Sequence, residues 1–388
     1  MTDSHDLETP HDRLVRLLGE IAAPPQVIDL TSAVPNWRLP DLALAELTQA
    51  QAWAANAPAQ GVDELVAALK VWLASSFALN SDAVGAEPIA TVGSREGLAS
   101  AIASALLAAA PNRRAVLLPE ASYHALSGAV VCANGSVRDV GAARGERLSR
   151  VLASLNEEAL RSVCALVFPF PTGLYAPSET KRTLRAVLDI ARDHNVMVIA
   201  DECMLELYED ARPPGFLDVV RDLGYFPDHL VVSSSLSKRS FVSGLRSACL
   251  VASQETSRQL HKVRKHISPV PPRPVQHASA HLWRDQHRDA TIRQHVSRSR
   301  RLLAEKYGQI FKVQLPDCGL YGWIAVEDDI RAAALAFGAG VRTMPASLLL
   351  RSPTASDAGA LRIALDGDHD KLAQGLDLLV ASLARLRP

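Results

Sequence analysis

The middle of the chain alternates short apolar runs with amphipathic helical patterns, and this alternation limits the folds open to it. Helices are predicted over 94–109 and over 177–194, the second starting at Pro177 and Ser178. Strands that alternate with helices predict an α/β fold, with a mostly parallel sheet in a large domain and helices on both faces. The apolar runs expected to be buried strands are AVLLP (115–119), VCALVF (163–168), VMVIA (196–200), LVVSS (230–234) and ACLVA (248–252).

A proline-rich segment indicates where the chain divides. ISPVPPRPVQ (267–276) breaks the helical pattern, and a long charged helix is expected after it, over about 285–307. The chain has 388 residues, 48% of them hydrophobic, which is enough for two cores. The expected domains are a large one over 50–284 and a smaller α/β one made from 1–49 and 285–388.

Charge and cysteine content argue against several kinds of partner. The formal net charge is −1 without a polybasic stretch, so neither nucleic acid nor a membrane surface is an expected partner. The first residues are polar and acidic, unlike a signal peptide, and no apolar run reaches the roughly 20 residues of a membrane span. The five cysteines are scattered, without a CxxC or Cys/His cluster. We therefore expect a cytoplasmic protein with reduced thiols and no metal site.

Polar residues follow several of the predicted strands directly. Lys238 follows LVVSS, and Asp201 follows VMVIA. Gly93, Ser94 and Arg95 stand between the IATV run and the first predicted helix, so their amides would form a helix N-terminus, which favours an anion. Ligands of such sheets bind at the carboxyl ends of the strands. We therefore expect these residues to meet at one edge of the sheet.

Two further residues near Lys238 could hold the same anion. Ser235 lies three positions before the lysine and Arg246 eight positions after it, and an arginine can bind an oxyanion through two parallel hydrogen bonds. The set then combines an amine nucleophile, a carboxylate and a phosphate-sized anion site. Pyridoxal 5'-phosphate needs a lysine for its aldehyde, an anion site for its phosphate and a carboxylate that keeps its ring nitrogen protonated. These residues therefore predict that cofactor.

The order and spacing of these residues resemble those of the class I and II aminotransferases, which are fold-type I pyridoxal-phosphate enzymes. The motifs that carry the resemblance run from about residue 27 to 386 in the order VIDLTSAVPNW, QGVDELVAAL, TVGSREGL, FPFPTG, VIADECMLELY, SLSKRSFVSGLR and LRIAL. The resemblance implies an aminotransferase, with an amino acid and a 2-oxo acid as substrates. It also implies a homodimer, because the family builds its active site across the subunit boundary.

The resemblance implies a role for each site residue. Lys238 would form the Schiff base with the cofactor and carry protons, and Asp201 would pair with the pyridine nitrogen. Arg362, in LRIAL, would bind the α-carboxylate of the substrate. Tyr123, in preference to His124, would stack on the cofactor ring. The implied phosphate-binding residues are Gly93, Ser94, Arg95, Ser235 and Arg246.

Three positions depart from the family pattern. Phe170 in FPFPTG and Met204 in DECM stand where asparagine and tyrosine are usual, and neither side chain can donate a hydrogen bond to the ring oxygen of the cofactor. Asn56 stands where a tyrosine usually reaches the phosphate of the neighbouring subunit. Tyr175 or Tyr208 could supply a missing donor. Without a donor to the ring oxygen, the pKa of the Schiff base between Lys238 and the cofactor would be raised, and the Schiff base would stay protonated to higher pH.

These departures leave three functions open. The first is an aminotransferase for an amino acid with a neutral or apolar side chain, since Arg273 is only a guess as a ligand for a distal carboxylate. The second is a pyridoxal-phosphate-dependent lyase, decarboxylase or cyclase of a specialised biosynthetic pathway, because the same carbanion chemistry leads to each. The third is a non-catalytic aminotransferase-like binding domain, against which the lack of a fused DNA-binding module argues.

Overall fold

The structure of the chain is a computed structural model, and it does not describe every residue. It describes residues 8–22, 24–140, 148–153, 155–172, 178–351 and 359–384. All of the predicted site residues lie within these ranges. Tyr175, one of the two tyrosines considered as a donor, and Pro177, the expected start of a helix, lie outside them.

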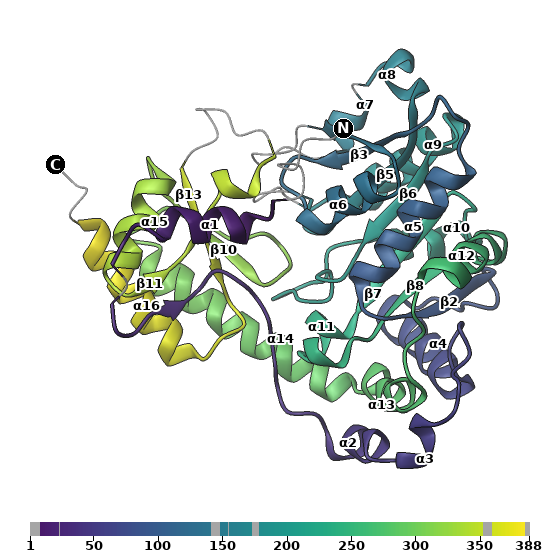
Figure 1. Cartoon of the computed structure of the whole chain (residues 1–388), viewed down its shortest axis with the longest axis horizontal. Helices are drawn as coiled ribbons and strands as arrows, with labels where there is room; N and C mark the ends of the chain where they lie inside the picture. Colours follow the sequence, from purple (N-terminus) through teal and green to yellow (C-terminus); the bar gives the residue numbers. More distant parts are fainter. Residues whose placement is uncertain are drawn as a thin grey trace.

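A seven-stranded sheet forms the centre of the larger part of the chain (Figure 1). Its order is β2-β8-β7-β6-β5-β3-β4, and every neighbouring pair is parallel except the two that contain β8. The mostly parallel α/β sheet predicted from the sequence is therefore confirmed. The strands are β2 (Ala86–Thr91), β3 (Ala115–Pro119), β4 (Ser136–Val140), β5 (Val163–Pro169), β6 (Met197–Asp201), β7 (Leu230–Ser235) and β8 (Ala248–Ser253).

The five apolar runs of the sequence coincide with β3, β5, β6, β7 and β8 to within one residue at each end. Their side chains are mostly buried, which is expected of strands covered on both faces by helices. The sequence gives no such signal for β4, because SVRDV is polar and mostly exposed at the edge of the sheet. A strand that lies at an edge does not need a continuous apolar run.

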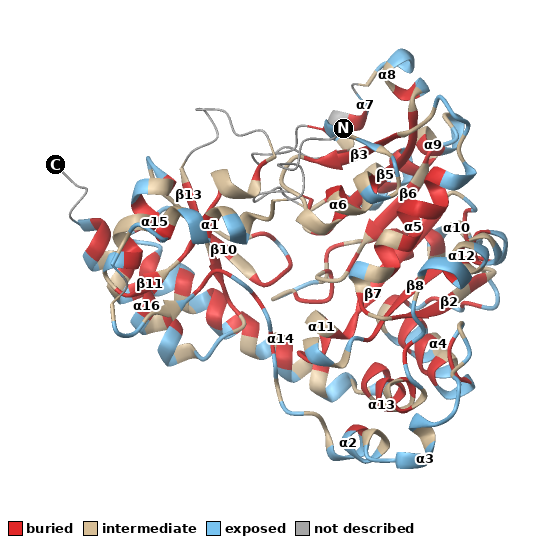
Figure 2. Cartoon of the chain, viewed as in Figure 1, coloured by how far each residue is buried: buried red, intermediate tan, exposed pale blue. Residues whose placement is uncertain are grey.

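Helices cover both faces of the large sheet, and its strands are mostly buried (Figure 2). Buried side chains form a core on each side of the sheet. The predicted helix over 94–109 is confirmed as α5. The expected start at Pro177 is wrong for α9, which begins at Lys181 because Thr180 and Thr183 form a reciprocal capping box. One face carries α4 (Asp63–Phe77), α9 (Lys181–Asp193), α10 (Phe216–Leu223) and α13 (Arg273–Arg284), and the other α5 (Ser94–Ala108), α6 (His124–Cys132) and α12 (Gln254–Ile267).

The N-terminal and C-terminal segments come together around a second, smaller sheet. The strand β1 (Ile28–Asp29) pairs in parallel with β11 (Val341–Arg342), and α1 (Pro10–Leu18) packs against α15 (Asp329–Gly338). The pair β1–β11 is a separate two-stranded sheet, and the smaller sheet itself consists of four antiparallel strands. In order, these are β12 (Met344–Pro345), β13 (Ala360–Ala364), β10 (Tyr321–Ala325) and β9 (Val313–Gln314). The last helix, α16 (His369–Leu383), completes its core.

One long helix, α14 (Gln286–Arg301), runs between the two parts of the chain (Figure 1). The short helix α2 (Asp41–Leu47) packs against α13 of the larger part. The domain boundaries after residues 49 and 284 stay a prediction. The other short helices are α3 (Ala50–Trp53), α7 (Leu148–Ala153), α8 (Glu157–Arg161) and α11 (Leu236–Arg239).

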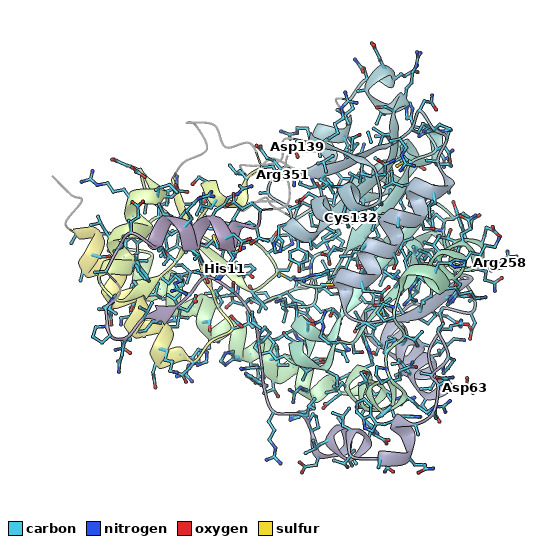
Figure 3. The ribbon with its side chains drawn as sticks, in the orientation of Figure 1. His11, Asp63, Cys132, Asp139, Arg258 and Arg351 are labelled. Carbon is cyan, nitrogen blue, oxygen red and sulfur yellow. The ribbon has the colours of Figure 1, made fainter. Side chains whose placement is uncertain are left out.

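Arg351 ties the smaller part to the end of the large sheet, and Figure 3 shows it beside Asp139. Its Nε donates to Asp139 Oδ1 over 2.6 Å, and its Nη1 donates to Ser122 Oγ over 2.9 Å. Its Nη2 also donates to the carbonyl of Pro119 over 2.8 Å. Ala121, in the same loop, packs against a cluster of the smaller part. The loop that leads from β3 to α6 is therefore held by both parts of the chain.

Glu202 is a buried carboxyl group directly behind the end of β6. Its Oε1 accepts a hydrogen bond from the amide of Phe216 over 2.5 Å, and among the described residues its Oε2 has no partner. Burial raises its pKa from 4.5 to about 8, and the nearby Asp218 adds to the rise. The side chain is therefore neutral in the folded protein at neutral pH, whereas it ionises in the unfolded chain.

We expect the stabilising effect of Glu202→Gln to grow with pH. The wild-type carboxyl stabilises the fold fully below about pH 4.5, and this contribution is lost as the pH rises through about 8, by about 1.4 kcal/mol per pH unit. Glutamine does not titrate, so its variant should be increasingly more stable than wild type between pH 5 and 8. Urea unfolding at several pH values measures the difference.

The exposed Glu327→Gln is the matched control and should show no such trend. A difference between Glu202→Gln and wild type that stays constant over the same pH range would contradict the neutral buried carboxyl.

Candidate active site

Lys238 lies in the short helix α11, directly after β7. Ser235 caps this helix, because its Oγ accepts from the amide of Ser237 over 3.1 Å; the same hydroxyl donates to the carbonyl of Ser247 over 3.3 Å. The Nζ of Lys238 donates to the carbonyl of Ala33, in the segment that precedes α2. The lysine therefore extends from the large sheet toward the N-terminal segment.

Asp201 is the last residue of β6, at the same edge of the sheet. Burial raises its pKa, while hydrogen bonds from Cys203 and the charge of Lys238 oppose the rise. Its Oδ1 accepts from the amide of Cys203 over 3.2 Å. A partly buried carboxylate in this position favours a cationic partner.

The start of α5 follows β2, and the guanidinium of Arg246 lies beside it. Gly93, the N-cap, has a φ of 79°, and no side chain caps the helix, so its first amides point outward. A Cβ on Gly93 would lie 2.1 Å from Nη2 of Arg246. The absence of a side chain on Gly93 therefore lets the guanidinium come close to the helix start. Ser94 lies in the same turn, and its hydroxyl interacts with the thiol of Cys203.

Two residues that the sequence did not single out fix this helix start. Glu96 Oε2 accepts from the amide of Val92 over 3.0 Å and lies 3.2 Å from Nη2 of Arg264 on α12. The Arg264 side chain is buried. Glu96 is three residues past the N-cap, a spacing typical of a capping glutamate, and that is the signal that could have found it.

Arg95, Tyr123 and His124 form a group beside the anion site. The Nε of Arg95 donates to the hydroxyl of Tyr123 over 2.8 Å, and the rings of Tyr123 and His124 lie 4.8 Å apart. Burial lowers the pKa of His124, and the charges of Arg95 and Arg362 lower it further. His124 is therefore close enough to both arginines to be affected by their charges. Both aromatic rings stand at the start of α6, so either could face a cofactor ring.

Arg362 lies on β13, in the smaller part of the chain. Its Nη2 donates to the carbonyl of Thr31 over 2.8 Å, and its guanidinium carbon lies 4.2 Å from the ring centre of Tyr321. Its Nε is buried and has no partner among the described residues, and burial lowers its pKa. A partly buried guanidinium with a free donor of this kind is suited to an anionic ligand.

Asp366 is a further residue near Lys238 that the sequence reasoning missed. Burial raises its pKa to about 6, while the charge of Lys238 and the amide of Val34 lower it. Three charged side chains thus contact the N-terminal segment. Arg362 donates to the carbonyl of Thr31, Lys238 donates to the carbonyl of Ala33, and Asp366 accepts from the amide of Val34. Asp366 lies two residues beyond the end of β13, and no local pattern in the sequence indicates that it approaches Lys238.

The three departures from the family pattern have different surroundings. The ring of Phe170 is buried, 5.4 Å from the ring of Phe168. Met204 lies beside Gly319. Asn56 is exposed, and its carbonyl accepts from Nη2 of Arg273, the residue considered for a distal carboxylate.

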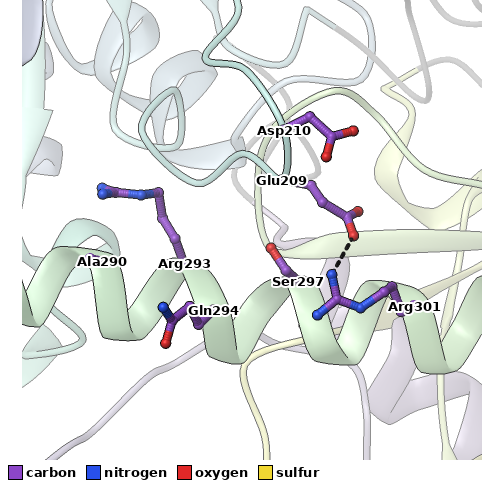
Figure 4. Close-up of a pocket in the computed structure, with 7 residues that line it drawn as sticks. All are labelled: Glu209, Asp210, Ala290, Arg293, Gln294, Ser297 and Arg301. Atoms are coloured by element: carbon purple, nitrogen blue, oxygen red, sulfur yellow. Dashed lines mark hydrogen bonds and ion pairs between the residues drawn. The ribbon is translucent and has the colours of Figure 1, made fainter.

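Tyr208 packs under Arg293, at 5.2 Å from guanidinium carbon to ring centre. Arg293 also lines a hollow against α14, whose volume is about 330 Å³. Figure 4 shows the residues around this hollow. The hollow is lined by Glu209, Asp210, Ala290, Arg293, Gln294, Ser297 and Arg301. None of the predicted site residues lines it, so it is a separate feature of the surface.

The donor set fits pyridoxal phosphate. The uncapped start of α5 and Arg246 suit a phosphate, the amine of Lys238 suits an aldehyde, and the partly buried carboxyl of Asp201 suits a protonated ring nitrogen. Within the described residues, no group of histidine, cysteine, aspartate or glutamate is placed to hold a metal ion. The same residues include no helix long and apolar enough to cross a membrane.

The family profile described as Aminotransferase class I and II matches residues 25–379. This chain belongs to the class I and II aminotransferases. It is therefore a pyridoxal-phosphate-dependent transferase that acts on an amino acid and a 2-oxo acid. The family assignment favours the first of the three functions considered from the sequence.

Individual aminotransferases are similar over most of the chain. The putative aminotransferase AatC of Rhizobium meliloti (strain 1021) is 25% identical over 318 residues, covering 80% of this chain and 76% of that protein. The 4-dedimethylamino-4-oxo-anhydrotetracycline transaminase OxyQ of Streptomyces rimosus is 29% identical over 323 residues, covering 81% and 84%. The crystal structure of an aminotransferase from Neisseria meningitidis Z2491 superimposes with a TM-score of 0.87, at 25% identity, over 98% of this chain and 97% of that one.

We expect Gly93→Ala to weaken cofactor binding by this aminotransferase at least about tenfold, because the new Cβ would displace the guanidinium of Arg246 from the start of α5. Gly224→Ala is a matched control, because Gly224 has a similar φ of 74° but no atom within 4 Å of the place that a Cβ would take. Absorbance titration with pyridoxal phosphate gives the dissociation constants. Equal affinity for pyridoxal phosphate in the two variants would show that binding by Arg246 does not require a glycine at position 93.

Proposed function

We propose that Lys238 is the residue that holds pyridoxal phosphate covalently and moves the proton during transamination. The observation that carries this proposal is the convergence of Lys238, Asp201 and the start of α5 at the carboxyl edge of one sheet. In this arrangement Gly93, Ser94, Arg95, Ser235 and Arg246 bind the phosphate, and Tyr123 stacks on the ring.

Each residue then has a defined chemical task. When bound, pyridoxal phosphate supplies the electron sink that stabilises the carbanion at the substrate Cα. Lys238 Nζ accepts the proton that leaves the substrate Cα. Asp201 holds a proton on the ring nitrogen, since a buried carboxylate stabilises a neighbouring cation. The amides at the start of α5 and the guanidinium of Arg246 balance the phosphate charge.

Arg362 binds the α-carboxylate of the substrate in this proposal. Its support is the unpartnered buried Nε together with the ring of Tyr321, which holds the guanidinium from one side. A carboxylate offers two acceptors to a planar guanidinium, and such a pair fixes the orientation of the Cα–H bond.

We further propose an amino acid with a neutral or apolar side chain as the substrate. Arg273, the residue considered for a second carboxylate, is engaged with the carbonyl of Asn56. Around the N-terminal segment, Phe241, Leu320 and Ala364 form an apolar cluster with Trp37 and Tyr321 packed against it. These surroundings favour an uncharged side chain over a second carboxylate.

We also propose that the protein is a cytoplasmic homodimer with domains at 50–284 and at 1–49 with 285–388. Exposed apolar side chains near α2, α3 and the proline-rich segment support a partner surface: Leu42 is 68% exposed, Trp53 50% and Ile267 59%. All five cysteines are free thiols, which agrees with a reducing compartment.

Replacing the lysine tests the central role. We expect Lys238→Ala to lose transamination by about 10²- to 10⁴-fold, because the proton carrier is removed. Borohydride reduction of wild type incubated with pyridoxal phosphate should add the mass of the reduced cofactor, and Lys238→Ala should gain none. Lys70→Ala, on a partly exposed lysine paired with Asp82, serves as the control. Cofactor found on a different lysine would refute the assignment.

Replacing the arginine tests substrate binding separately from cofactor binding. We expect Arg362→Lys to raise KM for both amino acid and 2-oxo acid by about 10- to 100-fold, because a lysine cannot form the paired hydrogen bonds. The dissociation constant for pyridoxal phosphate should be unchanged. Arg342→Lys is the control, because Arg342 lies on the strand β11 of the smaller part and is partly exposed. An unchanged KM in Arg362→Lys would rule out the carboxylate role.

A further inference from the structure

The residue after Lys238 is buried in an ionic network on the inner side of α11. The Arg239 side chain is only 2% exposed. Its Nε lies 3.1 Å from Oε2 of Glu206, and its Nη2 lies 2.5 Å from Oδ2 of Asp289. Its guanidinium carbon lies 5.1 Å from the ring centre of Trp283 and 5.8 Å from that of Trp72. One arginine thus contacts four separate segments of the fold.

The carboxylates that bind Arg239 are themselves held in place. Glu206 accepts hydrogen bonds from Nε1 of Trp72 over 2.9 Å and from Oγ of Ser76 over 2.7 Å, both on α4. Asp289 accepts from Oγ of Ser240 over 3.3 Å. A buried network with its acceptors fixed on several sides restricts the guanidinium to one position.

The same network attaches α11 to the long helix α14. Asp289 lies in the first turn of α14, and the preceding residue, Arg288, donates from Nε to the carbonyl of Ser240 over 2.9 Å. Ser240 is the C-cap of α11. The end of the lysine helix is therefore bound by Arg239 and Ser240 to the start of the helix that runs to the smaller part of the chain (Figure 1).

The helix α11 depends on such contacts because it has only four residues. A single helical turn is not stable by itself, so its geometry is set by what binds its ends. Ser235 fixes the first end through its cap, and Arg239 with Ser240 fixes the second. Lys238 lies between these two anchors.

We propose that Arg239 is a positioning residue for Lys238, which keeps the lysine amine in one geometry by fastening α11 to the first turn of α14. Arg239 does not touch the reacting atoms, and its effect passes through the backbone of α11. The inference rests on the proposed role of Lys238. It adds that a change in the position of α14 changes the position of the lysine amine.

Conservative variants test this proposal without removing a whole side chain from the ionic network. Arg239→Lys keeps the charge but loses the planar fork that reaches both carboxylates. Asp289→Asn removes the carboxylate charge that pairs Arg239 with α14, and it leaves the pair with Glu206 and the Arg288–Ser240 hydrogen bond intact. Burial raises the pKa of Asp289 to about 7, so asparagine also resembles its protonated form. Arg113→Met is the control, because Arg113 binds the carbonyls of Val163 and His194 at the opposite edge of the sheet.

We expect both variants to lower kcat by about 10- to 100-fold with little change in KM, as misplaced catalytic groups do. The pH at which the visible absorbance of the cofactor-loaded protein titrates should shift by about half a unit or more. Amide hydrogen exchange over 236–240, measured on cofactor-free protein, should accelerate. Arg113→Met should lower Tm and leave all three quantities unchanged.

The proposal is overturned if Arg239→Lys and Asp289→Asn match Arg113→Met, with lower Tm but unchanged kcat, titration and exchange. A failed borohydride trap on wild-type Lys238 is a different result, because it refutes the proposed function. Even then, unchanged exchange over 236–240 in the cofactor-free variants would refute the anchoring by Arg239, and faster exchange would support it.

Discussion

Parallel strands bring their carboxyl ends to one edge of a sheet, and the candidate cofactor site depends on this constraint. The start of α5 lies beside the start of β8, Asp201 ends β6, and α11 follows β7, so residues far apart in sequence reach the same edge. The strand β8 runs in the opposite direction to β7 and therefore begins at this edge. This reversal explains how Arg246, which precedes its strand, joins residues that follow theirs.

Three arginines with buried donor atoms differ in what balances their charge. Arg239 has two carboxylates, Glu206 and Asp289, and Arg264 has Glu96. For Arg362, a carbonyl and an aromatic ring are the contacts that the described residues provide. An uncompensated buried cation costs free energy unless a ligand brings the anion. The pairing pattern therefore separates arginines that hold the fold together from one that is suited to a substrate.

The sequence predicts those parts of the fold that depend on local patterns. Continuous apolar runs located β3 and β5 to within a residue, and the polar residues after the runs included Lys238 and Asp201. The polar edge strand β4 has no such pattern, and the start of α9 is set by a threonine pair instead of the expected proline.

Contacts between distant segments were beyond the reach of local patterns. Arg239 looks like an ordinary charged residue in sequence, and its carboxylates lie 33 residues before it and 50 after it. Asp366 becomes a neighbour of Lys238 only when the smaller sheet is in place. Which buried charge faces which partner is a property of the tertiary structure, and one sequence does not encode it in any short window.

Arg351 has a thermodynamic consequence for ligand affinity. It binds Ser122, the residue before Tyr123, and thereby joins the smaller part of the chain to a loop at the edge of the site. Linkage is reciprocal, so a ligand that binds more tightly when this contact is formed must stabilise the contact by the same free energy. The energy of one arginine between the two parts of the chain therefore enters the dissociation constant of a molecule that the arginine never touches.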